Sequence, residues 1–121
     1  MKNQKVKNIS YLCKAEFALA NTEKKELVAL PSGAEVVSVN LEITKAHAGG
    51  AVSIGLDDEV NVFLNNSATT KKGFTQSATL LTLKDNGVIT AKITGCEGVS
   101  EDAKGVLRVL YFLPSEILVE Y

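Results

Sequence analysis

The stretch that decides the fold runs from Leu30 to Gly55 and reads LPSGAEVVSVNLEITKAHAGGAVSIG. A Pro-Ser-Gly turn leads into a long segment of alternating apolar and polar residues, and a Gly-Gly turn leads into a second apolar segment. Because side chains alternate along a strand, one face of the long segment carries Val37, Val39, Leu41 and Ile43. That face is predicted to be buried and the opposite face solvated, which indicates an all-β protein.

Turn signals divide the rest of the chain into shorter segments of the same kind. Strands are predicted over residues 9–19, 26–30, 51–56, 59–64, 78–84, 88–94 and 105–113. No long segment with helical periodicity competes with them. The pattern predicts a single-domain antiparallel β-sandwich, jelly-roll-like, with about 7 to 8 strands.

Three local signals complete this organisation. The Asn86-Gly87 pair predicts a tight hairpin, because both residues tolerate positive φ. The polar stretch 65–77, in which Phe74 is the one large apolar residue, predicts a long surface loop. Pro114 predicts the end of the last sandwich strand. The chain is therefore divided into a basic N-terminal arm (1–8), a β-sandwich domain (9–113) and a C-terminal tail (114–121).

Length and composition limit the classes of function. A chain of 121 residues fits one domain, and 45% hydrophobic with 22% charged residues is typical of a folded chain. A formal net charge of -1 does not favour direct nucleic-acid binding. No apolar run approaches the roughly 18 residues of a membrane span, and the N-terminus lacks the apolar core of a signal peptide. We expect synthesis in the cytoplasm and no membrane partner.

The residues offer no recognisable catalytic or metal-binding set. His47 is the only histidine, and its neighbours Gly49 and Gly50 predict a partly exposed imidazole in a turn. Two cysteines and one histidine do not make a zinc set. The triplet Asp57-Asp58-Glu59 lacks the spacing of a calcium loop and is predicted to be a solvated turn. We expect no enzyme activity, no cofactor and no metal.

The charge distribution is uneven along the chain. Residues 1–14 carry lysines without an acid (Lys2, Lys5, Lys7 and Lys14), whereas residues 97–121 hold five acids against Lys104 and Arg108. One interpretation is a basic arm laid on an acidic partner surface. The other is a solvated, frayed terminus. Both remain open at the level of sequence.

Five segments in order resemble the small β-sandwich or jelly-roll capsid cement (decoration) proteins of tailed bacteriophages. They are ISYLCKAEFAL (9–19), NTEKKE (21–26), ELVALPSGAEVVSVNLEITKA (26–46), the glycine run 49–55 and GVLRVLYFL (105–113). The resemblance implies a structural virion protein, commonly a homotrimer, on the capsid exterior. Its partner would be the major capsid protein, whose neighbouring subunits it would bridge. The chain departs from the family pattern in its longer C-terminus after Tyr111.

On that basis, capsid contacts are expected at Lys2, Lys5, Lys7 and Tyr11. Subunit contacts are expected at Phe74, Leu118 and Tyr121. Two alternatives remain open: a receptor- or glycan-binding module of a tail or head fibre, and a tail-completion or connector protein. For the first alternative, Phe74 is the aromatic residue of the long loop that could stack on a sugar.

The two cysteines have different expected surroundings. Cys13 is in phase with apolar positions and is predicted to be a small buried hydrophobe, whereas Cys96 lies in a glycine-flanked turn and is predicted to be exposed. A cytoplasmic protein keeps its thiols reduced. A possible disulfide involving Cys13 and Cys96, internal or between subunits, is the alternative for a protein that leaves the cell on a particle.

Overall fold

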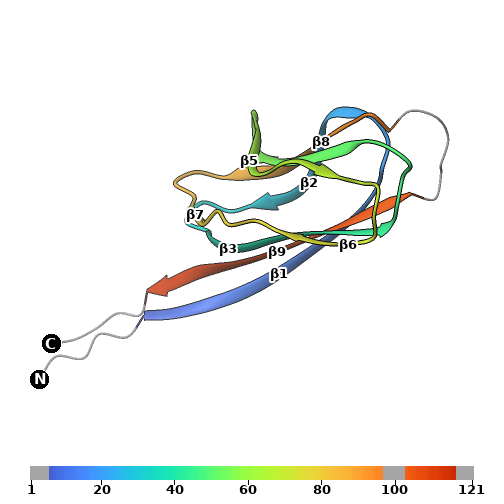
Figure 1. Ribbon diagram of the computed structural model, residues 1–121. Helices are drawn as coiled ribbons and strands as arrows, with labels where there is room; N and C mark the ends of the chain where they lie inside the picture. Colours follow the sequence, from blue (N-terminus) through green and yellow to red (C-terminus); the bar gives the residue numbers. More distant parts are fainter. Residues whose placement is uncertain (1–5, 97–102, 117–121) are drawn as a thin grey trace, which may run out of the picture.

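Two antiparallel sheets stacked face to face form the structure, a computed structural model that describes residues 6–96 and 103–116 (Figure 1). For residues 6–8 and 114–116 the description is limited to the backbone. The described residues contain strands and connecting turns, so the predicted all-β sandwich is confirmed. No helix in these ranges is long and apolar enough to span a membrane.

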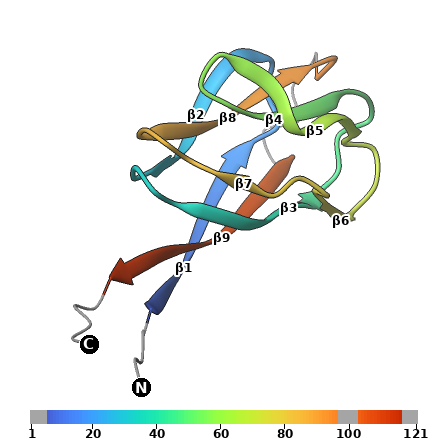
Figure 2. The same ribbon diagram turned by 90° about the vertical axis from the view of Figure 1, so that its left-hand side faces the viewer.

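The first sheet has the strand order β1 (Val6–Ala18), β9 (Lys104–Glu116), β3 (Glu35–Lys45) and β6 (Gly73–Gln76), with β7 (Leu81–Thr82) also paired to β3. The second sheet has the order β2 (Thr22–Leu30), β8 (Gly87–Thr94), β4 (Ala51–Leu56) and β5 (Glu59–Ala68). Figure 2 shows the second sheet lying across one part of the first sheet. The first and last of the described strands, β1 and β9, are therefore neighbours.

The hydrophobic core lies between the two sheets. Its largest fully buried aliphatic side chains come from both layers: Leu41, Ile54, Ile89, Ile93 and Leu107. Each such side chain contributes about 1.5–3 kcal/mol by leaving water. The alternation of apolar and polar residues in these strands is thus the feature that selects a two-layer fold.

A β-bulge changes the inward face of β3. Val36 pairs with Tyr111 and Ser38 pairs with Leu110, so Val37 is the extra residue of the bulge. Val36 is fully buried and Val37 is only partly buried. The sequence prediction that Val37 shares the buried face was wrong, whereas Val39, Leu41 and Ile43 lie on it as predicted.

The predicted hairpin around Asn86-Gly87 was also wrong. β7 pairs with β3 in the first sheet, while β8 pairs with β2 and β4 in the second, so the connection crosses from one layer to the other. Neither Asn86 nor Gly87 has positive φ. The true tight hairpin is β4–β5, where Asp57 has a φ of 52°.

Two further boundaries differ from the sequence prediction. β9 continues past Pro114 to Glu116, paired with β1. The stretch 65–77 contains the end of β5 and all of β6, so it is not a loop throughout. β6 is short and fully exposed, which explains why its sequence shows no buried face.

Candidate partner-binding surface

The free ends of β1 and β9 form a two-stranded ribbon, here called the arm and defined as 6–12 with 110–116. This arm shares only residues 6–8 with the basic N-terminal arm (1–8) of the sequence analysis. β3 accompanies β9 only as far as the pair Glu35 and Phe112. Beyond that point, the end of β9 pairs with β1 alone in the described part of the chain. Figures 1 and 2 show the ribbon projecting past the rest of the sandwich.

On the inner face of the arm, the exposure of the side chains increases with distance from the core. Along β1, Phe17 is 3% exposed, Cys13 and Ala15 are partly buried, and Tyr11 and Ile9 are 40% and 41% exposed. The second sheet covers only the Phe17 end of the strand. The sequence predicts burial along the whole strand, because the alternation continues where the covering layer does not.

The outer face of the arm is apolar as well. Leu12 is 66% exposed, and it lies opposite the partly buried Leu110. Phe112, also partly buried, lies on the same face opposite Ser10. Further along the sheet this face becomes charged, with Arg108 bonded to Glu42 at 2.7 Å. A two-stranded ribbon with apolar residues on both faces is marginal in water, so the arm has the character of a binding surface.

The arm is braced where it joins the sandwich by two tyrosines on facing strands. Tyr11 and Tyr111 are directly opposite each other, and their rings stack with centroids 5.2 Å apart and an interplanar angle of 18°. Such a pair contributes about 0.5–1.5 kcal/mol beyond its buried area. Burial raises the pKa of Tyr111, and the neighbouring Cys13 thiol and Tyr11 raise it further.

This raised pKa predicts a loss of stability in alkali. The unfolded chain releases the Tyr111 proton first, so stability falls as the pH rises past the ordinary tyrosine pKa of about 10. Tyr111→Phe should remove this part of the loss, because phenylalanine has no proton to release. Urea unfolding at pH 8 and near pH 10.5 measures the difference. An equal alkaline loss in both proteins would contradict the assignment.

A second exposed apolar site lies at the opposite edge of the first sheet. Phe74 on β6 is 68% exposed, and Leu80, in the segment before β7, is 67% exposed. Phe74 pairs with Glu42 and shares the outer face of the sheet with it. The exposure of Phe74 suits the expected subunit contact. Leu80 was not singled out from the sequence, although the Leu80-Leu81 doublet allows only one of the two to face inward.

The other expected contacts are not described by the structure. Lys2, Lys5, Leu118 and Tyr121 lie outside the described residues. Lys7 lies in β1 opposite Ser115, and only its backbone is described. These contacts therefore stay predictions. Of the expected capsid-contact residues, Tyr11 is the one whose side chain is placed, and it lies on the arm.

His47 is a structural residue of the corner between β3 and β4. It is 8% exposed, so the predicted exposed imidazole was wrong. Its Nδ1 lies 2.6 Å from the carbonyl oxygen and 3.1 Å from the amide nitrogen of Gly49, and its backbone amide donates to the Thr69 carbonyl. In the described structure, the hydrogen-bond partner of the ring is Gly49. No nucleophile is paired with this imidazole in the described structure.

Both cysteines are free thiols. Cys96 is 6% exposed, so the prediction that it is exposed was wrong; its Sγ packs at the Gly49-Gly50 corner and donates to the Gly49 carbonyl at 3.6 Å. Cys13 is partly buried on the inner face of β1. The described structure contains no internal disulfide, and a bond between subunits stays a prediction.

The acidic triplet forms the turn of the β4–β5 hairpin, as predicted. The Asp57 carboxylate accepts a hydrogen bond from the Val88 amide at 3.0 Å, and Asp58 forms an exposed ion pair with Lys24 at 3.2 Å. Among residues 6–96 and 103–116, no group of three His, Cys, Asp or Glu side chains could hold a metal ion.

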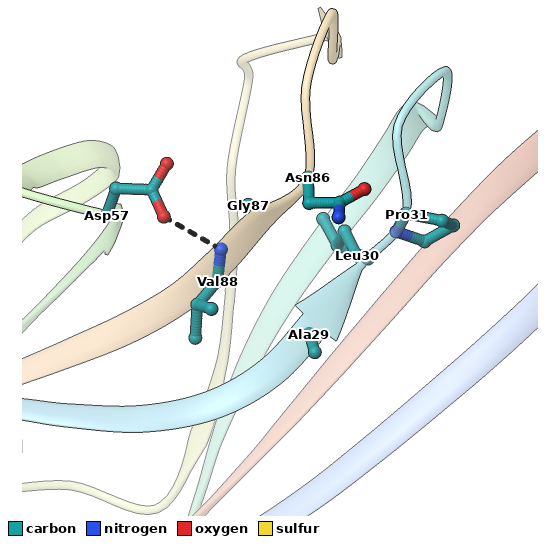
Figure 3. A pocket seen from close by; sticks show the side chains of 7 residues that line it. All are labelled: Ala29, Leu30, Pro31, Asp57, Asn86, Gly87 and Val88. Carbon is teal, nitrogen blue, oxygen red and sulfur yellow. Dashed lines mark hydrogen bonds between the residues drawn. The ribbon is translucent and has the colours of Figure 1, made fainter.

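A hollow of about 440 Å³ opens beside this turn, between Leu30-Pro31 and Gly87-Val88 (Figure 3). Its polar groups already have partners: Asp57 bonds to Val88, and the Asn86 side chain accepts from the Ser32 amide at 2.8 Å. The described residues also contain no buried side-chain polar atom without a hydrogen bond. The hydrogen bonds of Asp57 and Asn86 are thus structural ones, which hold the chain segments around the hollow together.

The fold and the projecting arm define a class of small all-β proteins with two stacked sheets, and comparison with solved structures specifies it. The chain is 42% identical to a chain from the "Acidic stable capsid structure of Helicobacter pylori bacteriophage KHP30", over 97% of this chain and 100% of that chain, with a TM-score of 0.79. It belongs to the family of that phage capsid protein and is a structural virion protein.

Two further capsid structures share the fold. A chain of the Cyanophage Pam1 capsid asymmetric unit is 20% identical, with 93% of this chain and 86% of that chain covered and a TM-score of 0.59. A chain of the capsid of Ralstonia phage GP4 is 15% identical, with 90% and 86% covered and a TM-score of 0.64. No family model and no curated protein sequence matches the chain.

Proposed function

We propose that this chain is a cement (decoration) protein that binds the outer surface of a phage capsid and bridges neighbouring major capsid protein subunits. The observation that carries the proposal is the arm, which exposes apolar side chains on both faces beyond the body of the sandwich. A rigid body with a projecting apolar ribbon suits the joining of subunits, because the ribbon can enter a groove on one of them while the body rests on another.

The chemistry of the arm indicates the kind of surface that receives it. Leu12, Tyr11 and Ile9 offer apolar contact area, and aromatic side chains are frequent anchors of protein interfaces. Lys2, Lys5 and Lys7 belong to the same end of the chain and add positive charge. The proposed receptor is therefore an apolar groove with an acidic rim on the major capsid protein.

The proposal includes a homotrimer at local threefold positions, with subunit contacts through Phe74, Leu118 and Tyr121. The exposed Phe74 ring supports this part. Each copy would add a modest interface, and the repeated array would resist the internal pressure of packaged DNA through many parallel contacts.

The test adds purified chain to expanded capsid shells that lack it, and measures binding by co-sedimentation. Ile9→Glu places a charge on the exposed inner face of the arm and should weaken binding about tenfold or more, which corresponds to about 1.4 kcal/mol. Leu80→Glu is the control, because Leu80 is exposed but lies outside the arm, in the segment before β7, and it should bind like the wild type. Urea unfolding of both variants checks that they are folded.

The same shells distinguish the proposal from its alternatives. Shells saturated with wild-type chain should survive heating and low ionic strength better than bare shells. If the chain bound isolated tails rather than shells, a connector or fibre role would replace the cement role. If bare and saturated shells disassembled at the same temperature, the bridging mechanism would be wrong.

A further inference from the structure

Three of the four edges of the two sheets carry features that discourage pairing with another chain. β6 and β7, which share one edge of the first sheet, have only four and two residues. β2 has two register irregularities against β8 and four consecutive charged residues, Glu23 to Glu26. β5 has two irregularities against β4, and Asn66 within it has a φ of 50°. Short, charged and bulged edges are the usual protection against strand addition.

β1, the fourth edge, lacks this protection. Its 13 residues pair with β9 in one unbroken register, and none of them is proline. No strand of the described part pairs with its other side. Leu12, with 66% exposure, stands in the middle of the strand. A long, regular and partly apolar edge is a template for a further strand.

We propose that the β1 strands of two copies of this chain pair with each other, antiparallel, about a twofold axis at Leu12. The inference rests on the proposed function, because it joins neighbouring copies that the same shell holds side by side. A twofold interface uses one surface patch twice, so a single strand supplies both partners. The first sheets of the two copies then form one continuous sheet.

The position of the axis follows from the sequence of the strand. Leu12 is the midpoint of Val6–Ala18, so an axis at Leu12 gives the register in which every residue of β1 has a partner in the other copy. An axis at Lys14 or at Glu16 would oppose like charges across the interface. An axis at Ala15 would leave the exposed Ile9 and Tyr11 beyond the paired region.

The chosen register is also chemically compatible. Leu12 meets its own copy, Lys14 lies opposite Ser10, and Glu16 lies opposite Asn8. On the inner face, Tyr11 lies opposite Cys13, and no like charges are opposed. Since the pairing uses the edge of the arm, both faces of the ribbon stay available for a shell.

The pairing can be tested by disulfide cross-linking of the full chain in a Cys13→Ala background. Residues directly opposite in an antiparallel pair have Cα atoms about 4.5 or 5.5 Å apart, and both distances permit a disulfide. Leu12→Cys should therefore form a covalent dimer with itself after mild oxidation, both free in solution and on shells. Leu12 is exposed, so the substitution leaves the fold intact.

Two matched variants fix the register. Ser10→Cys alone should give about tenfold less dimer, because its two copies lie about 14 Å apart along the strand. Lys14→Cys alone should behave in the same way. A mixture of the two variants should cross-link, since residue 10 lies opposite residue 14. The wild-type Cys13 should not link to its copy, because Cys13 faces Tyr11.

The inference would be overturned if Leu12→Cys formed no covalent dimer, either in solution or on shells. It would also be overturned if Ser10→Cys alone formed as much dimer as Leu12→Cys. Binding of the chain to shells is measured separately from cross-linking, by co-sedimentation. Chain that binds shells without this cross-link would leave the cement role standing and refute the pairing. If Leu12→Cys cross-linked in solution but the wild-type chain failed to bind shells, the pairing would be supported and the cement role refuted.

Discussion

Gly55→Ala is expected to remove most of the stability of the fold. A Cβ atom at this position in β4 would overlap the carbonyl oxygen of Glu59 and lie 2.5 Å from the carbonyl carbon of Val60. Both obstacles are backbone atoms of β5: Glu59 pairs with Leu56, and Val60 lies in the register irregularity between the Leu56 and Ile54 pairs. Relief would require the two strands to separate, which would open the second sheet at the core residue Ile54.

The expected cost of Gly55→Ala is about 4 kcal/mol or more, which is a large part of the stability of a typical domain. Gly33→Ala is the control. Gly33 has a φ of 86° but no atom within 4 Å of its would-be Cβ, so its substitution should cost only about 1 kcal/mol of backbone strain. Urea unfolding followed by circular dichroism measures both variants. If the two substitutions lowered the free energy of unfolding by similar amounts, β5 would have to move aside easily. The close approach of β5 to Gly55 would then not limit the residue at this position.

Gly50→Ala should have the second-largest effect, and a partial rescue should identify its cause. Gly50 has a φ of 119°, and an added Cβ would lie 2.5 Å from the Cys96 Sγ and 2.9 Å from the Thr94 carbonyl oxygen. We expect a cost of about 3 kcal/mol from strain and overlap together.

Cys96→Ala removes the sulfur that the new methyl group would strike. In the double variant, about 1 kcal/mol of the Gly50→Ala cost should therefore be recovered relative to additivity. The strain of positive φ and the contact with Thr94 remain, so the rescue is incomplete. Strictly additive costs in a double-mutant cycle would mean that the thiol moves aside freely.

The sequence predicts the parts of this fold that depend on local alternation. The strand 51–56 is found where it was predicted, and Val39, Leu41 and Ile43 face the core. Val37 fails because an inserted bulge residue reverses the alternation without changing the composition. The Asn86-Gly87 hairpin fails because a turn signal does not specify to which sheet the following strand belongs.

The partner-binding surface could be predicted only in part. Tyr11 was singled out through the basic N-terminal segment, but the contribution of β9, with Leu110 and Phe112 on the outer face, was not. The alternation in β1 is the same where the second sheet covers it and where it does not, so exposure of Ile9 and Tyr11 depends on the extent of another layer. The burial of His47 and Cys96 is likewise set by loops distant in sequence.

The place of β9 in the first sheet has a consequence for biosynthesis. Among the described strands it is the last to leave the ribosome, yet it lies between β1 and β3 and holds them together. Until it emerges, the first strand of the nascent chain has no partner, and pairs as distant as Tyr11 with Tyr111 make folding slow compared with local hairpins. The ribbon that would dock on a shell is therefore assembled only after β9 has been synthesised, so translation products that lack β9 do not compete for binding sites.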